Sequence, residues 1–328
     1  YWIDEERGNV FCLIDAPTQD AVEEMHRQAH GLIPNRIIEV NSTIVESFLG
    51  RIYDPAEATI SDDGLKVFSD SSFRFLLVTK ITDPALLQYK LGKEKANELL
   101  NHHNAIVRKN LLFHGGREVE HEGSGFIISF ASATKAVACA LAIREEMQNS
   151  AGDPIGFRAG VNAGEPVEKS NKLFGDTLQL AAYMCAVAKE YQISVSSSVK
   201  ELVSKDHLLK EKNSFLCLSL QDEALLDLLF DKLEENWQNP DFDIEEYGQS
   251  VAMSKSQLYR KTIALTGLSP NILLKEFRLE RAKDLMKKQC YSIAQITFDS
   301  GFTSASYFTK CFKKKYGLLP MAYLDLLH

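Results

Sequence analysis

The chain has 328 residues, which exceeds what one hydrophobic core usually organises, so its length predicts two or three domains. With 45% hydrophobic and 25% charged residues it has the composition of an ordinary globular protein, which argues against a disordered chain. A formal net charge of −8 would argue against nucleic-acid binding if the charge were spread evenly along the sequence.

The charge is instead concentrated by sign. Between residues 251 and 318 the sequence contains thirteen Lys and Arg residues against four Asp and Glu residues, a balance of about +9. The C-terminal third is therefore the part of the chain in which a polyanionic partner is expected.

The six cysteines are scattered and form no Cys-x-x-Cys pair, so the sequence predicts neither a zinc site nor a disulfide framework. No stretch approaches the roughly 20 consecutive apolar residues of a membrane span, and no leader pattern opens the chain. We expect a cytoplasmic protein without a membrane partner and without a bound cofactor.

The first part of the chain has a mixed pattern. Residues 8–15 and 36–40 are rich in apolar and β-branched side chains and predict strands, whereas residues 18–31 have helical spacing. We expect residues 1–41 to form a partial small α+β domain. Residues 42–70 contain Pro, Gly, Asp and Ser without lasting periodicity, which predicts a linker.

Residues 71–205 are expected to form a second, larger α+β domain. Strand patterns and helix patterns alternate there, which is typical of helices packed on one sheet. The expected strands are 73–81, a hairpin over 117–130 with a Gly-Ser turn, 155–167 and 193–197, and the expected helices are one ending before His114, 133–148 and 176–190. From Leu220 onward only helical patterns remain, so residues 219–328 are predicted to be an all-α domain.

This C-terminal domain contains a first helix-turn-helix pattern. Ile244, Tyr247 and Val251 form one apolar helical face, Ala252 keeps the following turn close, and Ser254 is placed to cap the next helix. That helix presents Ser256, Tyr259, Arg260 and Lys261 among its polar positions.

A second pattern of the same kind follows about fifty residues later. Ile293 and Ile296 provide the apolar face, Gly301 makes the turn, and Ser304 is placed to cap a helix. The aromatic residues at helical spacing are expected in the core: Phe302, Phe308, Phe312 and Tyr316. Two such units allow two recognition helices to enter successive major grooves of DNA.

The stretches FRLERAKDLMKK and SIAQITFDSGFTSASYFTKCFKKKYGLLPMAYL closely resemble the signature of the AraC family of transcription regulators, over about Leu220 to Leu324. The resemblance implies double-stranded DNA as partner. It places base-edge contacts on Ser256, Tyr259 and Arg260 of the first recognition helix and on Ala305, Ser306 and Lys310 of the second. Phosphate contacts are expected from the flanking lysines Lys261, Lys313, Lys314 and Lys315.

Residues 73–203 resemble the class III nucleotide cyclase homology domain, through HGGREVEHEGSGFIISF, FRAGVNAGEP and LFGDTLQLAAYMCAVA. Active members of that family need two aspartates for two metal ions, and these positions fall on Lys80 and Ser124. The family's asparagine and arginine for the transition state fall on Gln179 and Tyr183. The domain is therefore expected to be a degenerate cyclase domain, not an enzyme.

Two functional hypotheses follow. The preferred one is a DNA-binding transcription regulator in which the cyclase-like domain serves dimerisation, giving a homodimer, and senses an unidentified small-molecule effector. The alternative is a nucleotide cyclase, or a protein that binds a cyclic nucleotide without turnover, fused to a DNA-binding domain.

Residues 1–40 resemble a small ferredoxin-like domain family, some members of which bind nickel, through WIDE, FCLIDAP and HRQAHG. His26 and His30 lie four residues apart on the predicted helix, so both imidazoles could reach one transition metal, with Cys12 nearby. Because two histidines on a polar helix face usually bind nothing, packing or dimerisation is the preferred role for this segment.

Overall fold

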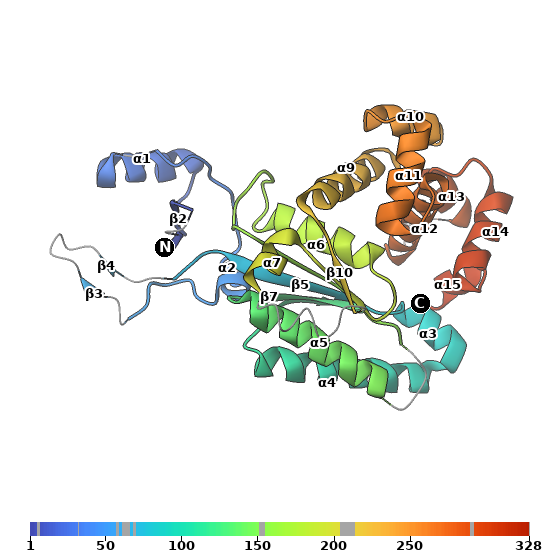
Figure 1. The fold of residues 1–328 in the computed structure, drawn as a ribbon, viewed down its shortest axis with the longest axis horizontal. Helices are drawn as coiled ribbons and strands as arrows, with labels where there is room; N and C mark the ends of the chain where they lie inside the picture. The colour runs from blue at the N-terminus through green and yellow to red at the C-terminus, as the bar shows by residue number, and fades with distance from the viewer. Residues whose placement is uncertain are drawn as a thin grey trace.

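The computed structural model describes residues 1–4, 7–31, 33–56, 59–60, 66–67, 70–150, 155–203, 214–288 and 292–327. Figure 1 shows a small N-terminal part, a central sheet covered by helices and a helical C-terminal part. The expected fold class is confirmed: a mixed α/β middle region is followed by a region made of helices.

The N-terminal part pairs β1 (Trp2–Asp4) with β2 (Asn9–Phe11) in an antiparallel ribbon. Helix α1 (Gln19–His30) begins where the Thr18 side chain accepts a hydrogen bond from Ala21 N and ends at Gly31, in the left-handed region. The strand predicted over residues 36–40 is wrong: these described residues form no strand, since no neighbouring strand pairs with them.

The segment 42–70, predicted as a linker, contains helix α2 (Ser42–Leu49) and the short ribbon of β3 (Thr59–Ile60) and β4 (Lys66–Val67). Phe48 of α2 is buried and stacks on Phe174 at 4.9 Å between ring centroids. The linker prediction was therefore wrong for α2, because eight residues are too few to establish a helical period in the sequence.

Arg74 explains how α2 is held. Its buried guanidinium donates from Nε to Phe48 O at 3.2 Å and from Nη2 to Leu49 O at 3.0 Å, and Ser129 Oγ donates to Phe48 O at 2.7 Å. The orphan carbonyls at the end of α2 are thus satisfied by the middle sheet.

The middle region is one six-stranded sheet in the order β10-β9-β8-β5-β7-β6. The strands are β5 (Arg74–Lys80), β6 (Arg117–Glu122), β7 (Gly125–Phe130), β8 (Arg158–Gly164), β9 (Gln192–Val195) and β10 (Phe215–Cys217). The pairs β8–β9 and β9–β10 are parallel and the others antiparallel. Each strand predicted for this region has a counterpart, whereas β10 was not predicted.

Helices cover both faces of this sheet. The helices are α3 (Pro84–Leu91), α4 (Lys93–Phe113), α5 (Ala133–Asn149), α6 (Gly175–Val187) and α7 (Ser197–Leu202). In Figure 1, α4 and α5 lie below the sheet and α6 above it. Gly160 of β8 lets α6 approach closely, because a Cβ at this position would lie 2.2 Å from Ala181 O.

The C-terminal region consists of α9 (Leu220–Asn236), α10 (Ile244–Ser250), α11 (Lys255–Thr266), α12 (Pro270–Lys287), α13 (Ile293–Asp299), α14 (Ala305–Tyr316) and α15 (Pro320–Asp325). The units α10–α11 and α13–α14 repeat the same local chemistry. The predicted caps are confirmed: Ser254 Oγ accepts from Gln257 N and Ser304 Oγ accepts from Tyr307 N. Gly267 and Gly317 end α11 and α14 in the left-handed region.

The turn of each unit needs a positive φ. Ala252 has φ 53° in the first unit and Gly301 has φ 75° in the second. Gly301 also lies against the end of α9, because a Cβ there would be 2.2 Å from Trp237 O. The same carbonyl accepts a hydrogen bond from Arg278 Nε at 3.0 Å.

Replacing Gly301 by Ala should therefore lower the free energy of unfolding by about 2 kcal/mol or more, since the methyl group adds a backbone clash to the left-handed strain. Gly267→Ala is the matched control: Gly267 has φ 73°, and a Cβ added there would meet no atom within 4 Å. Gly267→Ala should lower the free energy of unfolding by only about 1 kcal/mol. Urea denaturation measures both, and equal losses would show that the contact with Trp237 costs nothing.

Candidate nucleic-acid interface

Helix α11 presents its predicted contact residues to solvent. Its apolar positions Leu258 and Leu265 are buried. On the other face Ser256, Arg260 and Lys261 are exposed. Tyr259 is 55% exposed, which is unusual for so large an aromatic ring. The helical period thus separates a core face from a polar face that carries all four predicted side chains.

Helix α14 has the same division. The described residues predicted as core are confirmed as buried: Phe302, Phe308, Phe312 and Tyr316. On the opposite face Ala305, Ser306, Lys310 and Lys314 are exposed. Tyr307, which the sequence interpretation did not select, is 54% exposed beside them.

The two exposed faces correspond position by position. Counting from the capping serines Ser254 and Ser304, each helix carries a serine at the second following position and a cation at the sixth. These are Ser256 with Arg260 in α11, and Ser306 with Lys310 in α14. Because each pair lies one helical turn apart, hydroxyl and cation point the same way in both units.

One lysine predicted to contact phosphate, Lys315, is paired with carboxylates of its own domain. Lys315 Nζ lies 2.5 Å from Glu276 Oε2 and 3.1 Å from Glu280 Oε1, at the junction of α12 and α14. Its charge is neutralised within the domain, whereas Lys261, Lys313 and Lys314 remain exposed. Position in the helix decides this: Lys315 lies on the side of α14 that faces α12.

The four cyclase-like positions lie in two places, at the end of β5 with the neighbouring β6–β7 turn, and on α6. Lys80 ends β5, and Ser124 lies in the β6–β7 turn, where its carbonyl accepts a hydrogen bond from Ile81 N at 2.8 Å. Gln179 and Tyr183 lie one turn apart on α6. Among the described residues, no three His, Cys, Asp or Glu side chains are arranged to hold a metal ion.

Gln179 and Tyr183 are both occupied by contacts with α9. Gln179 Nε2 donates to Asp231 Oδ1 at 2.6 Å, and Tyr183 Oη donates to the same oxygen at 3.3 Å. The Tyr183 ring stacks on Phe230 with centroids 4.6 Å apart. Burial, together with the charge of Asp231, raises the pKa of Tyr183 well above its usual range, so the phenol stays neutral as a hydrogen-bond donor.

Asp83, the acidic residue three positions beyond Lys80, is also engaged in hydrogen bonds. Its carboxylate accepts from Ala85 N at 3.0 Å and so caps α3. It further accepts from Lys283 Nζ at 3.0 Å and from Tyr323 Oη at 2.9 Å. Burial opposes ionisation, but the charge of Lys283 and these hydrogen bonds outweigh it and lower the pKa of Asp83.

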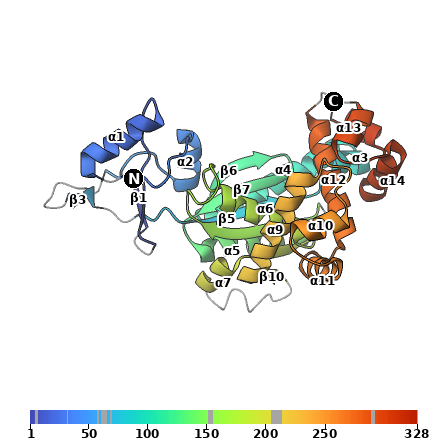
Figure 2. The same cartoon turned by 90° about the horizontal axis from the view of Figure 1, so that it is seen from above.

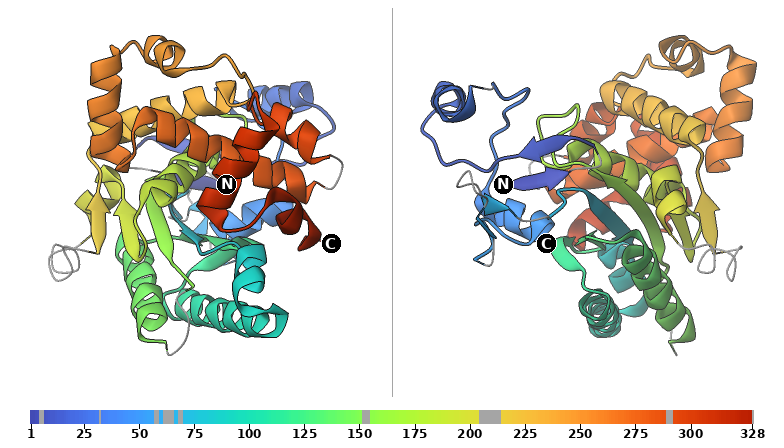
Figure 3. Two further views of the ribbon diagram at one scale, coloured as in Figure 1. Left: turned by 90° about the vertical axis from the view of Figure 1, so that its right-hand side faces the viewer. Right: turned by 60° about the vertical axis from the view of Figure 1, so that its left-hand side comes forward.

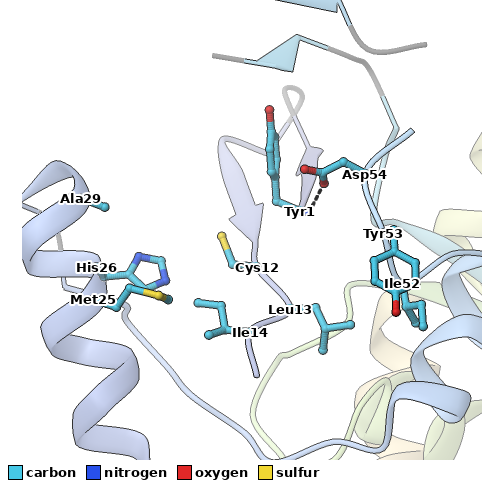
Figure 4. A pocket seen from close by; sticks show the side chains of 10 residues that line it. All are labelled: Tyr1, Cys12, Leu13, Ile14, Met25, His26, Ala29, Ile52, Tyr53 and Asp54. Atoms are coloured by element: carbon cyan, nitrogen blue, oxygen red, sulfur yellow. Dashed lines mark hydrogen bonds and ion pairs between the residues drawn. The ribbon is translucent and has the colours of Figure 1, made fainter. Parts of the chain in front are cut away.

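The N-terminal segment forms a pocket of about 390 Å³. Figure 4 shows Cys12, Met25 and His26 beside this space, with Tyr53 on the other side. Burial raises the pKa of the Cys12 thiol. The predicted pairing of His26 with His30 is not tested, since the His30 side chain lies outside the described part of the structure.

Within the described residues, no helix combines the length and the apolar character needed to cross a membrane.

Asp227 of α9 is a destabilising group beside the contact between α6 and α9. Its Oδ1 is buried without a hydrogen-bond partner in the described structure. Burial, followed by the neighbouring charge of Asp231, raises the pKa of Asp227 to about 6. A carboxyl with a raised folded-state pKa favours folding at low pH and loses this contribution as the pH rises through about 6.

Asp227→Asn should therefore raise the free energy of unfolding by about 1 kcal/mol at about pH 7.5, after allowance for partial exposure, with no gain at about pH 4. Thermal denaturation at the two pH values measures this. Asp241→Asn, at an exposed position, is the control and should change neither. A destabilised Asp227→Asn protein at the higher pH would contradict the assignment.

Comparison with known families gives three matches along the chain. The Helix-turn-helix domain family matches residues 247–325. The Adenylate and Guanylate cyclase catalytic domain family matches residues 76–219. The family described as nickel responsive protein SCO4226-like matches residues 1–40.

Similar proteins match parts of the chain. A histidine kinase P4 of Formosa agariphila is 37% identical over 110 residues, which are 34% of this chain and 8% of that protein. The HTH-type transcriptional regulator MtrA of Neisseria gonorrhoeae is 31% identical over 99 residues, 30% of this chain and 31% of that protein. The chain thus spans less than a third of the length of these curated relatives.

Among solved structures, the guanylyl cyclase domain of the RhoGC fusion protein from Blastocladiella emersonii is similar, with 20% identity and a TM-score of 0.36, over 40% of this chain and 84% of that one. The three family matches confirm the three resemblances expected from the sequence. The chain carries an SCO4226-like segment, a class III nucleotide cyclase homology domain and, at its C-terminal end, a helix-turn-helix DNA-binding domain of the AraC family.

Proposed function

We propose that this protein is a sequence-specific DNA-binding transcription regulator. The observation that carries the proposal is the pair of equivalent helices α11 and α14, each with an exposed serine and an exposed cation one turn apart. A guanidinium such as that of Arg260 can donate two hydrogen bonds to one guanine, and Lys310 can donate to the same acceptors.

Charge supports the same function. The segment 251–318 has a balance of about +9 in a chain whose net charge is −8. Lys261 and Lys314 are exposed near the same faces as Arg260 and Lys310. In this proposal they contact phosphates, fixing the position of the domain without reading sequence.

We further propose that the middle domain is not catalytic and serves regulation of DNA binding. A cation at Lys80 repels a divalent metal ion, and Ser124 is a weak ligand. Gln179 and Tyr183 are engaged by Asp231 instead of facing a free site. Homodimerisation and the sensing of an unidentified effector stay predictions.

The first experiment selects duplexes from a random library with the full chain at two salt concentrations. Wild type should enrich two adjacent elements, one for each helix. The Arg260→Ala, Lys310→Ala double variant should lose this enrichment, with affinity for the selected duplex reduced about tenfold or more, while weak salt-sensitive binding remains.

Lys90→Ala, Lys93→Ala is the matched control, because it removes two exposed cations from the middle domain. It should select the same duplexes as wild type. If the control and the Arg260, Lys310 variant behave alike, these two side chains do not read bases.

A second experiment tests catalysis. The purified chain incubated with ATP or GTP and Mg²⁺ or Mn²⁺ should form no cyclic nucleotide above a mock preparation, because the metal-binding and phosphate-stabilising side chains are replaced. Chromatography with mass detection measures the product. Metal-dependent turnover would favour the alternative, a nucleotide cyclase fused to a DNA-binding domain.

A further inference from the structure

The DNA-binding domain contacts the middle domain at two separate places. In Figure 2, α9 lies over α6, and α12 and α14 lie near α3. In the left view of Figure 3 the red C-terminal helices again lie beside α3. These two contacts involve the two helix-turn-helix units separately.

The first contact joins α6 to the first unit. Tyr183 is only 8% exposed, since its ring is covered by Phe230 of α9. Leu180 and Met184 pack in the same cluster as Leu226 and Leu229, and this cluster continues into the first unit through Tyr247 and Leu258. Tyr247 Oη in turn donates to Leu229 O at 3.0 Å. The core of the first unit is thus continuous with α6.

The second contact joins the corner after β5 to the second unit. Ala85 and Leu86 of α3 are buried in one cluster with Leu279, Met286 and Phe312. No residue is shared between this cluster and the cluster around the first unit. The second unit therefore has its own core, to which α3 contributes.

A buried group of charges reinforces the second contact. Lys283 and Asp83 have side chains only 7% and 8% exposed, with Nζ 3.0 Å from Oδ2. Lys283 Nζ also lies 3.1 Å from Glu280 Oε2, and Tyr316 Oη donates to Glu280 Oε1 at 2.9 Å. Separation of the domains would leave Lys283 without one of its two carboxylates, so the contact is costly to open.

We propose that the middle domain acts as a clamp, which holds the two helix-turn-helix units in the arrangement that binds DNA. Helix α6 packs against the first unit, and the Asp83–Leu86 corner packs against the second. The inference rests on the proposed DNA-binding function and adds its regulation. The face of α6 that carries Gln179 and Tyr183 thereby binds another domain of the same chain.

The geometry favours a middle domain that positions the two units over one that blocks their DNA-contacting side chains. The predicted base-contacting side chains of α11 and α14 are exposed while both contacts are made. The two units are also related by α12, by the approach of Gly301 to Trp237 and by the hydrogen bond from Gln238 Nε2 to Asp299 O at 3.2 Å. The contacts with α6 and α3 add two further points at which their relative position is fixed. Two units held in register lose less orientational freedom on binding two grooves, which increases affinity.

The test uses the full chain with substitutions on the middle-domain side of each contact, so that no side chain of the helix-turn-helix units is changed. Tyr183→Ala removes the stack on Phe230, and Leu86→Asp places a charge against the second unit. The probes are a duplex selected by wild type that carries both elements, and the same duplex with one element scrambled.

Both variants should bind the two-element duplex about fivefold or more weakly, and the combined variant more weakly still, while binding to the one-element duplex changes less than about twofold. Small-angle scattering of the combined variant should show an expanded particle. Circular dichroism establishes that the variants are folded.

The controls make the same chemical changes away from the contacts. Tyr89→Ala removes a tyrosine that is 53% exposed on α3, and Leu112→Asp replaces a leucine that is 73% exposed near the end of α4. Both should behave as wild type. Asp83→Asn, which retains an oxygen to cap α3, should weaken binding to the two-element duplex in the same direction as Leu86→Asp.

Unchanged binding of the two-element duplex by the combined variant would overturn the clamp, and tighter binding would overturn it in favour of inhibition by the middle domain. Equal losses on both duplexes would also overturn it, because a clamp acts on the second element. If wild type selects no duplex at all, the proposed function fails and the inference falls with it.

Discussion

The carboxylate of Asp83 joins the two large domains of this protein. It caps α3 in the middle domain and accepts hydrogen bonds from Lys283 and Tyr323 of the C-terminal domain. A carboxylate so far from water would be costly if it were unpaired, and its partners lie two hundred or more residues further along the chain. The placement of α12 and α15 beside the sheet depends on this local satisfaction of charge.

The contact between the two large domains involves residues of the cyclase-like domain at and near the cyclase-like positions. In the proposed correspondence with active cyclases, the positions for metal and phosphate fall on Lys80, Ser124, Gln179 and Tyr183. Two of these side chains contact α9, and Asp83 nearby contacts α12 and α15. A fold can keep its architecture while one of its faces changes chemistry, since the core under the sheet is independent of that face.

The structure of the C-terminal domain follows from local sequence patterns, namely caps, turn residues and helical spacing, and the sequence predicted it well. Ser254 and Ser304 cap their helices, Gly301 makes its turn with positive φ, and the aromatic residues of α14 form its core. Local patterns predicted the N-terminal part less well. The predicted strand at 36–40 lacks a partner, and α2 is stabilised by Arg74 and Phe174, which are distant in sequence.

The sequence by itself determined the order of the three family segments, most of the helices and strands, and the exposed faces of α11 and α14, because caps, periodicity and turn residues act over a few positions. Tertiary structure decided what the polar side chains do. Lys315 looks like a phosphate contact in sequence, but it pairs with Glu276 and Glu280 because α14 packs on α12. Likewise, only folding brings Asp231 to Gln179 and Lys283 to Asp83, since burial and pairing across such separations leave no local pattern in the sequence.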